Sequence, residues 1–397
     1  MRCGRAAGLS FPFFVDLLEL IEIKFYPPKE LDDLACWRIA ADLVTPHNAS
    51  MNTNPSFHSI PLSASLDASH PTSSLVDRFG RQVDYLRVSV TDKCDLRCSY
   101  CMPKGFRGFE EPENWLNFAE IERVVAAFGR MGVRRVRLTG GEPLLRKNLS
   151  HLVLALSSHS EIEDISLSTN ATQLEKHAEA LYAAGVRRVN VSLDSLDRAC
   201  VESITGSDNL QQVMRGLQAA KRVGMRPIKL NMVVLGGIND HEIKRMVGFC
   251  MEEGFILRLI EAMPVGSTGQ SSQFRDLQPI REELVKSFDL QPMVEEIGGG
   301  PARYWSNRDG SSTVGFISPM SQHFCATCNR VRLGVDGTLY MCLGQNSQFP
   351  LRQRLRDGIS DTELEQCIRE AIELKPERHE FNSKPTQIIR FMSQTGG

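Results

Sequence analysis

From Tyr85 onward, short runs rich in branched apolar residues alternate with longer amphipathic stretches. The runs predict β-strands and the stretches predict helices that bury one face. The expected strands span residues 86–90, 135–138, 165–168, 189–193, 228–234 and 256–260, and the expected helices span residues 118–131, 148–156, 173–184, 209–223 and 240–253. Such an alternation is typical of a parallel sheet with covered faces. Six units are fewer than the eight of a closed barrel, so we expect an α/β fold, either a partial barrel or a doubly wound sheet.

The pattern changes at residue 298, where three successive glycines precede Pro301. Short strands are expected at residues 303–306 and 313–317, and two helices are expected near the C-terminus. We therefore divide the chain into a core of residues 77–297 and a C-terminal extension of residues 298–397.

The first 76 residues differ in composition from the rest. They hold eight acidic and five basic residues, whereas a mitochondrial transit peptide is basic and poor in acids. Acidic residues also interrupt the apolar run 11–25 and spoil it as a signal-peptide core. Residues 45–74 are dominated by Ser, Thr, Asn and Pro, which is typical of disorder. Because Met51 lies in this stretch, residues 1–50 are either a short natural extension or an over-extended gene model.

Unusual residues follow the expected strands at their carboxyl ends. Cysteines follow the first strand, a Gly-Gly-Glu-Pro turn at residues 140–143 follows the second, and Asn170 and Asp194 follow the third and fourth. In parallel α/β folds these ends open onto one face, where binding sites are built. The sequence therefore predicts a functional site at this face.

Three of the 11 cysteines form a first triplet, Cys94-x3-Cys98-x2-Cys101. Three thiolates so close together can bind a soft metal ion or an iron–sulfur cluster. A structural zinc site normally has a fourth ligand, and none is near in the sequence. Three ligands would leave one iron of a cluster open for a further ligand. The alternative is three unrelated buried thiols.

A second triplet, Cys325-x2-Cys328-x13-Cys342, lies in the extension. A redox pair, half a zinc ribbon, or a zinc ion closed by an unrecognised ligand are the alternatives to a second cluster. Arg330 and Arg332 alternate on a short expected strand, so both point to the same side. Two guanidinium groups beside a metal site favour an anionic, phosphate-bearing ligand, although a solvated strand face would show the same pattern.

The first triplet followed by Gly-Gly-Glu-Pro resembles the radical S-adenosylmethionine superfamily. The resemblance implies that Cys94, Cys98 and Cys101 hold a [4Fe–4S] cluster whose open iron binds S-adenosyl-L-methionine. It also implies the partial (β/α)6 TIM-like barrel, with the C-terminal α+β extension closing its open side. By position, the residues that contact S-adenosyl-L-methionine are Tyr100, Gly141, Ser192 and Met263.

The paired triplets, the segment Asn-Arg-Val-Arg-Leu at residues 329–333 and the terminal Gly396-Gly397 resemble the GTP 3′,8-cyclase family within that superfamily. The resemblance implies a second [4Fe–4S] cluster on Cys325, Cys328 and Cys342, and it implies that Gly396 and Gly397 enter the site. The implied GTP contacts are Arg87, Arg137, Ser168, Lys229, Arg330, Val331 and Arg332, and Arg258 is a further candidate. Two positions depart from the family pattern: Ser168 replaces its usual Thr and Ala171 its usual Gly.

The implied activity is that of a lyase that converts GTP to (8S)-3′,8-cyclo-7,8-dihydroguanosine 5′-triphosphate, the first step of molybdenum cofactor biosynthesis. The implied partners are a one-electron reductant, a downstream cyclic pyranopterin monophosphate synthase and a second copy of the chain in a homodimer. A net charge of −2 and the lack of an 18-residue apolar run favour a cytoplasmic protein that binds neither nucleic acid nor membrane. The alternatives are a radical enzyme that modifies peptides and a non-enzymatic metal-binding regulatory module.

Overall fold

A computed structural model describes residues 74–294 and 297–396 of the chain. The expectations for residues 1–73, including a start at Met51, and for Gly397 lie outside these described residues.

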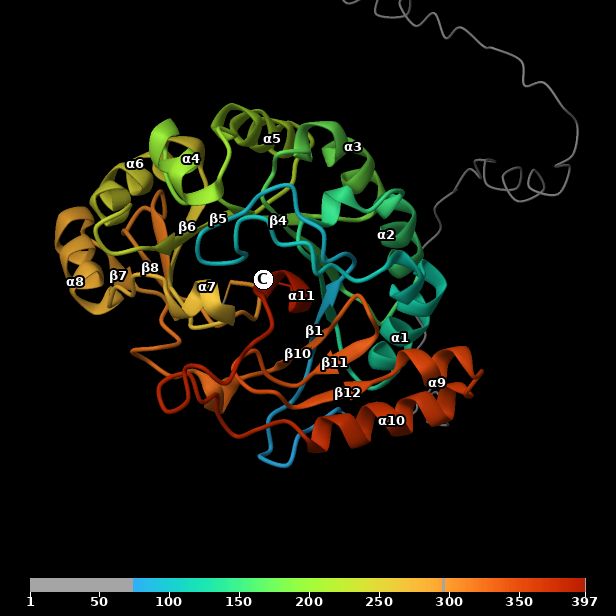
Figure 1. Cartoon of the computed structure of the whole chain (residues 1–397). Helices are drawn as coiled ribbons and strands as arrows, with labels where there is room; N and C mark the ends of the chain where they lie inside the picture. Colours follow the sequence, from blue (N-terminus) through green and yellow to red (C-terminus); the bar gives the residue numbers. More distant parts are fainter. Residues whose placement is uncertain (1–73, 295–296, 397) are drawn as a thin grey trace, which may run out of the picture. The chain divides into compact units, whose positions relative to one another are not determined.

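Six parallel strands in sequence order form the wall of an open barrel, and helices cover its outer side (Figure 1). The strands are β1 (Tyr85–Ser89), β2 (Arg135–Thr139), β3 (Asp164–Thr169), β4 (Arg188–Ser192), β5 (Ile228–Val234) and β6 (Ile256–Glu261). The helices between them are α1 (Phe118–Arg130), α2 (Leu149–Ser157), α3 (Leu174–Ala184), α4 (Arg198–Thr205), α5 (Leu210–Arg222) and α6 (Ile243–Glu253). This arrangement confirms the expected partial (β/α)6 barrel.

The later part of the chain adds strands to both edges of this wall. On one edge, β9 (Thr313–Ile317) pairs parallel with β6 and continues through β8 (Arg303–Ser306) and β7 (Gln291–Pro292). On the other, β10 (Arg330–Leu333) pairs parallel with β1 and continues through β11 (Thr338–Tyr340) and β12 (Gln348–Pro350). The result is one open twelve-stranded sheet. The division at residue 298 stays a prediction.

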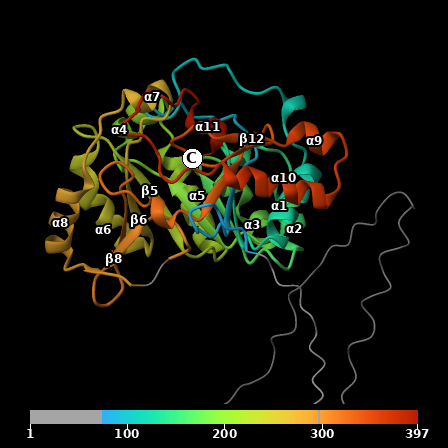
Figure 2. The same cartoon turned by 90° about the horizontal axis from the view of Figure 1, so that it is seen from below.

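The remaining helices of the described residues follow β6 in the chain. They are α7 (Gly266–Gln270), α8 (Leu277–Phe288), α9 (Arg352–Arg356), α10 (Asp361–Glu373) and α11 (Met392–Thr395). Helix α10 runs beside α1 (Figure 2), where Arg130 Nε lies 2.6 Å from Glu365 Oε1. Helix α11 lies at the centre of the ring of strands (Figure 1). The extension thus has three helices where two were expected.

Helices α4, α7 and α8 are also absent from the helices predicted from the sequence. Helix α4 begins at Asp197, whose carboxylate accepts from Cys200 N, and ends at Gly206 with φ +75°. An acidic N-cap and a left-handed glycine at the end are standard helix signals, but they enclose only eight residues. So short a segment has little periodicity to detect.

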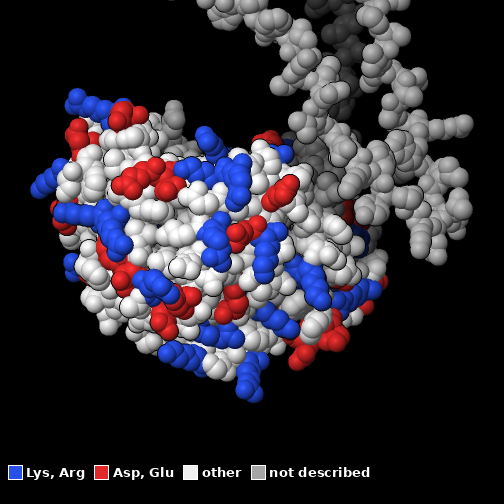
Figure 3. All heavy atoms as spheres, turned by 90° about the horizontal axis from the view of Figure 1, so that it is seen from above, with Lys and Arg blue, Asp and Glu red and all other residues white. Residues whose placement is uncertain are grey.

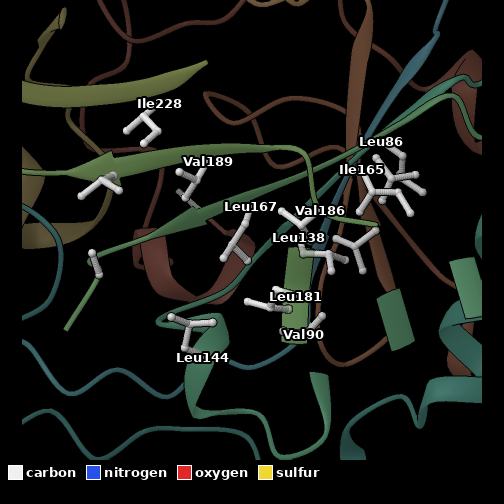
Figure 4. Close-up of a cluster of buried hydrophobic side chains, with 14 of the residues drawn as sticks. Leu86, Val90, Leu138, Leu144, Ile165, Leu167, Leu181, Val186, Val189 and Ile228 are labelled. Atoms are coloured by element: carbon white, nitrogen blue, oxygen red, sulfur yellow. The ribbon is translucent and has the colours of Figure 1, made fainter. Parts of the chain in front are cut away.

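Apolar side chains on the outer face of the wall pack against the covering helices. Leu86, Leu138, Leu167 and Val189 belong to this core (Figure 4) and are at most 3 % exposed. Burying each contributes roughly 1.5–3 kcal/mol. Because side chains alternate along a strand, the residues between them point into the barrel. Those inner positions include polar side chains such as Arg87, Arg137 and Asn190.

The surface carries both signs of charge. On the face in Figure 3, Lys and Arg side chains are interspersed with Asp and Glu. No helix within residues 74–294 and 297–396 combines the length and the apolar character needed to span a membrane.

Candidate functional site

A cavity of about 300 Å³ lies inside the barrel at the carboxyl ends of the strands, and all six cysteines of the two triplets line it. The four residues predicted to contact S-adenosyl-L-methionine also line it, as do six of the seven predicted GTP contacts. The exception is Lys229. Sequence positions from 85 to 393 thus meet around one space.

Helix α4 supports the loop of the first triplet. Arg97 N donates to Thr205 O at 2.9 Å and Ser99 N donates to Ile204 O at 2.8 Å. Within the loop, Cys101 N donates to Cys98 O at 2.9 Å. These backbone bonds hold the three thiols toward the cavity, and they explain why a helix that the sequence analysis missed matters for the site.

Tyr100 is held by a carboxylate that follows the end of β4. Its hydroxyl donates to Asp194 Oδ2 at 2.7 Å, and Val233 N donates to Asp194 Oδ1 at 2.8 Å. Burial raises the pKa of Asp194 to about 6, and these two hydrogen bonds oppose the rise. Asp194 therefore braces the triplet loop against β4 and β5.

The Gly-Gly-Glu-Pro turn joins three strand ends. A side chain on Gly140 would overlap Thr91 O, and a Cβ on Gly141 would lie 2.6 Å from Asp92 O, so only glycine permits this approach. Gly141 N donates to Thr91 O at 2.7 Å. The turn thereby keeps β2 and the loop after β1 in fixed positions.

Glu142 extends this connection to β3. Its carboxylate accepts from Thr169 Oγ1 at 2.7 Å and from Asn170 N at 2.7 Å. Burial raises the pKa of Glu142 to about 7. In the turn after Asn170, the backbone of Ala171 is left-handed, with φ +63°. The structure therefore places Ala171 in a conformation that glycine adopts more readily.

The first triplet fits a cationic metal centre. Burial raises the pKa of Cys94 to about 12 and that of Cys101 to about 11. Thiols in such surroundings stay protonated unless a metal ion binds them, and iron–sulfur clusters take cysteine thiolates. Three sulfur donors that line one cavity suit a [4Fe–4S] cluster.

The second triplet lies among cations. Lys375 Nζ donates to Cys328 Sγ at 3.3 Å, and Arg390 Nη2 donates to Cys342 O at 3.1 Å. Burial acts to raise the pKa of Cys328, but Lys375 and Arg330 outweigh it and lower the pKa to about 7. Lys375 is only 2 % exposed and was not predicted as a site residue. Its side chain reaches the thiol from the end of α10, a contact that strand patterns cannot reveal.

Two histidines lie beside this triplet. His323 Nδ1 is 3.2 Å from His379 Nε2, and their ligand atoms lie within 4.8 Å of one another and of Cys325 Sγ. His323 and His379 could complete a zinc site with Cys325, but such a site would include only one of the three cysteines of the triplet.

Arginines of the adjacent strands β10, β1 and β2 lie side by side on the cavity wall. Arg87 is in register with Arg137 on one side and with Arg332 on the other. Arg258 donates to Asn190 Oδ1 at 2.5 Å and to Asn231 Oδ1 at 2.8 Å. Burial lowers the pKa of Arg258 and that of Arg332 to about 10, which leaves both charged at neutral pH.

Buried polar atoms of the wall that lack a hydrogen-bond partner among the described residues include Ser168 Oγ and Arg330 Nε, which belong to predicted GTP contacts. Buried polar groups are normally paired, so these atoms fit a polar ligand that completes them.

Lys229 is held away from the cavity. Its Nζ donates to Ile297 O at 2.8 Å and to Tyr304 OH at 3.2 Å. Burial, together with Arg258, lowers the pKa of Lys229 to about 6. The sequence analysis missed Tyr304, because its place beside β5 depends on β9 joining β6. Lys229 as a GTP contact stays a prediction.

The C-terminal tail enters the cavity, where Met392 and Ser393 line it. Gly396 has φ +74°, its carbonyl accepts from Arg332 Nη1, and a Cβ at this position would overlap the Thr139 side chain. The Phe391 ring packs against Phe106, with ring centroids 5.0 Å apart. Gly396 therefore lies against side chains of β2 and β10, and its entry into the site stays a prediction.

Two family models match the chain. The Radical SAM superfamily matches residues 88–250 and Molybdenum Cofactor Synthesis C matches residues 255–381.

Curated relatives and solved structures add to this. The chain is 44 % identical to GTP 3′,8-cyclase of Ectopseudomonas mendocina over 82 % of this chain and 99 % of the relative, and 43 % identical to that of Paracoccus denitrificans over 85 % and 100 %. The crystal structure of Streptococcus suis SuiB bound to S-adenosylmethionine aligns with a TM-score of 0.51 at 18 % identity, covering 66 % of this chain and 61 % of that one. That likeness shows the barrel fold alone.

Proposed function

The chain belongs to the GTP 3′,8-cyclase family, and from this premise we propose which of its residues bind S-adenosyl-L-methionine and GTP. The activity is the conversion of GTP to (8S)-3′,8-cyclo-7,8-dihydroguanosine 5′-triphosphate, the first step of molybdenum cofactor biosynthesis. The chain uses two [4Fe–4S] clusters and S-adenosyl-L-methionine. The observation that carries the assignment of roles is the single cavity lined by both cysteine triplets.

At the end of the cavity near α4, Cys94, Cys98 and Cys101 would hold the first cluster. The chemistry that it would supply is one-electron reductive cleavage of the sulfonium of S-adenosyl-L-methionine. Gly141 presents backbone to the methionine moiety, because nothing larger fits beside Asp92 O. Tyr100, oriented by Asp194, lies at the adenine side, and Ser192 and Met263 complete the pocket.

At the other end, Cys325, Cys328 and Cys342 hold the second cluster beside the guanine base. The triphosphate, of charge near −4, lies against Arg87, Arg137, Arg330 and Arg332, with Arg258 behind them. Charge-assisted hydrogen bonds from several guanidinium groups in a buried cavity bind such an anion strongly. Ser168 Oγ and Arg330 Nε gain the partners that they lack among the described residues.

Filled in this way, the cavity would hold the ribose of GTP beside the 5′ carbon of S-adenosyl-L-methionine. The chemistry supplied there would be removal of the hydrogen at C3′ and formation of a bond between C3′ and C8 of guanine. Each turnover would take up two electrons, one for cleavage of S-adenosyl-L-methionine and one, with a proton, to complete the cyclised nucleotide. The tail around Gly396 keeps water from the reacting ribose and helps to position it.

Further assignments accompany this proposal. A one-electron reductant supplies the clusters, and cyclic pyranopterin monophosphate synthase consumes the product. The homodimer and the cytoplasmic location are proposed on the family resemblance.

The test is anaerobic incubation of the reconstituted full chain with GTP, S-adenosyl-L-methionine and dithionite. We expect about eight irons per chain, release of 5′-deoxyadenosine and formation of the cyclised nucleotide. Zinc in place of iron, or 5′-deoxyadenosine released without a cyclised nucleotide, would contradict the proposal.

A further inference from the structure

A second hollow lies on the outer side of the first-triplet loop. This outer groove, of about 520 Å³, is lined by Cys94, Asp95, Arg97, Phe106, Arg107 and Phe109. Cys94 also lines the internal cavity. One ligand of the first cluster therefore faces both the reaction space and the outer groove. In Figure 2 the cyan segment that carries this loop arches over the same end of the barrel as α7 and α11.

Cationic side chains outnumber acidic ones along the outer groove. Arg97 and Arg107 line it against one carboxylate, that of Asp95, which accepts from Asn170 Nδ2 at 2.7 Å and from Thr172 Oγ1 at 2.6 Å. The exposed Lys104 adds a further positive charge in the same loop. The acidic residues that follow in the chain do not line it.

The groove also connects a cation directly to the cluster loop. Arg97 Nη1 donates to Cys94 O at 2.7 Å, and its guanidinium lies 5.6 Å from the centroid of the Phe109 ring. Phe106 and Phe109 meet edge to face, with centroids 5.2 Å apart. A small apolar floor with cations around it is typical of sites where proteins associate briefly by charge complementarity.

We propose that the outer groove is the docking site of an acidic one-electron carrier protein. The inference rests on the proposed function, which requires reduction of the cluster held by Cys94, Cys98 and Cys101. The carrier is oxidised by one electron and the cluster is reduced by one electron, so no bond is broken in the step. Electron transfer falls off steeply with distance, and docking here places the carrier's redox group against a cluster ligand. Acidic side chains of the carrier meet Lys104, Arg97 and Arg107.

The experiment compares two reductants on the cluster-loaded full chain. The variant Lys104→Glu/Arg107→Glu reverses two exposed charges of the loop that carry no role in substrate binding. The matched control, Arg222→Glu/Lys286→Glu, reverses two exposed charges in the last turns of α5 and α8. Reduced flavodoxin is the acidic protein probe, and dithionite is the small reductant. The readouts are the flavodoxin dissociation constant, the rate of first-cluster reduction followed by absorbance, and 5′-deoxyadenosine release.

We expect the loop variant to bind flavodoxin more weakly and to be reduced by it about 10-fold or more slowly at low salt, with the difference shrinking at high salt. Dithionite-driven reduction should match that of the unmodified chain, and the control should match it with both reductants. Unchanged flavodoxin binding in the loop variant overturns the proposal. So does an equal loss with dithionite, in that pair or in Lys104→Ala/Arg107→Ala, because the loop would then serve the site itself. Cluster reduction without GTP cyclisation would instead count against the proposed function.

Discussion

Each of the two cysteine triplets offers three thiols, but the electrostatic surroundings of the two triplets differ. Around the first, burial raises the pKa values of the Cys94 and Cys101 thiols, and the carboxylates of Glu142 and Asp95 add to the rise at Cys94, whereas Arg97 bonds to the backbone carbonyl of Cys94 rather than to a thiol. Around the second, Lys375 and Arg330 lower the pKa of Cys328 to about 7. Since the local charge helps to set the potential of an iron–sulfur cluster, equal ligands need not give equal centres.

The difference matches the two tasks. Nearby carboxylates disfavour an added electron, so the first cluster becomes a stronger reductant, as cleavage of a sulfonium requires. Nearby cations favour negative charge, so the second site suits a nucleotide triphosphate and a cluster that is easier to reduce. The contrast teaches that the surroundings, more than the ligand spacing, separate a radical-generating site from a substrate site.

The largest expected effect comes from removing a ligand on one side or the other. Cys94→Ala should abolish 5′-deoxyadenosine formation. Cys328→Ala should instead lower the iron content from about eight to about four and abolish the cyclised nucleotide, while the first cluster remains. Iron analysis and product chromatography measure both.

Cys367→Ala is the control, because Cys367 lies outside both triplets, and its iron content should be unchanged. If Cys94→Ala formed 5′-deoxyadenosine at the normal rate, the assignment of the first triplet would be wrong.

The next effect concerns the tail that lies between the two triplets. Replacing Gly396 and Gly397 by Ala forces a left-handed alanine against the Thr139 side chain. We expect near-normal iron content and GTP binding but a loss of cyclisation on the order of 100-fold, because a displacement of about 1 Å of reacting groups costs that much. The measurement is cyclised product per 5′-deoxyadenosine.

Gly358→Ala is the matched control. Gly358 has φ +79°, but a Cβ there meets nothing within 4 Å, so only backbone strain is added. The control should lose stability and keep its activity. Normal turnover of the double tail variant would show that the tail does not position the substrate.

A smaller effect tests the cationic surroundings of the second triplet directly. Lys375→Met removes the ammonium group that donates to Cys328 Sγ, so the reduction potential of the second cluster should fall while that of the first stays unchanged. A unit charge at 4 Å is worth about 4 kcal/mol at an effective dielectric of 20, which bounds the shift. Redox titration followed by electron paramagnetic resonance separates the two clusters.

Lys384→Met serves as the control, because its ammonium is exposed and pairs with Glu380. It should leave both potentials unchanged. Equal shifts of the two potentials in Lys375→Met would refute the contrast between the triplets.

The smallest effect concerns Ala171, near the first triplet. In Ala171→Gly, relief of the left-handed alanine, about 1–2 kcal/mol, is offset by greater chain entropy and by the loss of a buried methyl group. We expect the free energy of unfolding to change by less than about 0.5 kcal/mol, with unchanged activity. Denaturant titration measures it.

The same substitution at Ala178, buried in α3, should cost about 1 kcal/mol because the helix gains nothing from glycine. A loss at Ala171 as large as that at Ala178 would mean that its conformation carries no strain.

The sequence predicted what local patterns encode. The six core strands, the two triplets and the inward pair Arg330 and Arg332 all lie where spacing placed them. The hydrogen bonds that orient the site residues join segments that are far apart in the sequence, so no local sequence pattern predicts them. Asp194 was noted only as a residue at a strand end, and its bond to Tyr100 needs the triplet loop to fold back over β4. Lys229 was expected in the cavity, but Tyr304 holds it because β8 and β9 extend the sheet at β6.

The pairing of β1 with β10 can form only late in the synthesis of the chain. Asn329, just before β10, bonds to Asp84, just before β1, across a separation of 245 residues. A ribosome must therefore make most of the chain before β1 gains its second neighbour, and contacts so far apart in sequence form slowly. During that delay the first-triplet loop and its supporting helix α4 are already complete, while the arginines of β10 are still missing. Synthesis itself thus leaves an interval in which the residues of the first site are all present while those of the second site are still missing.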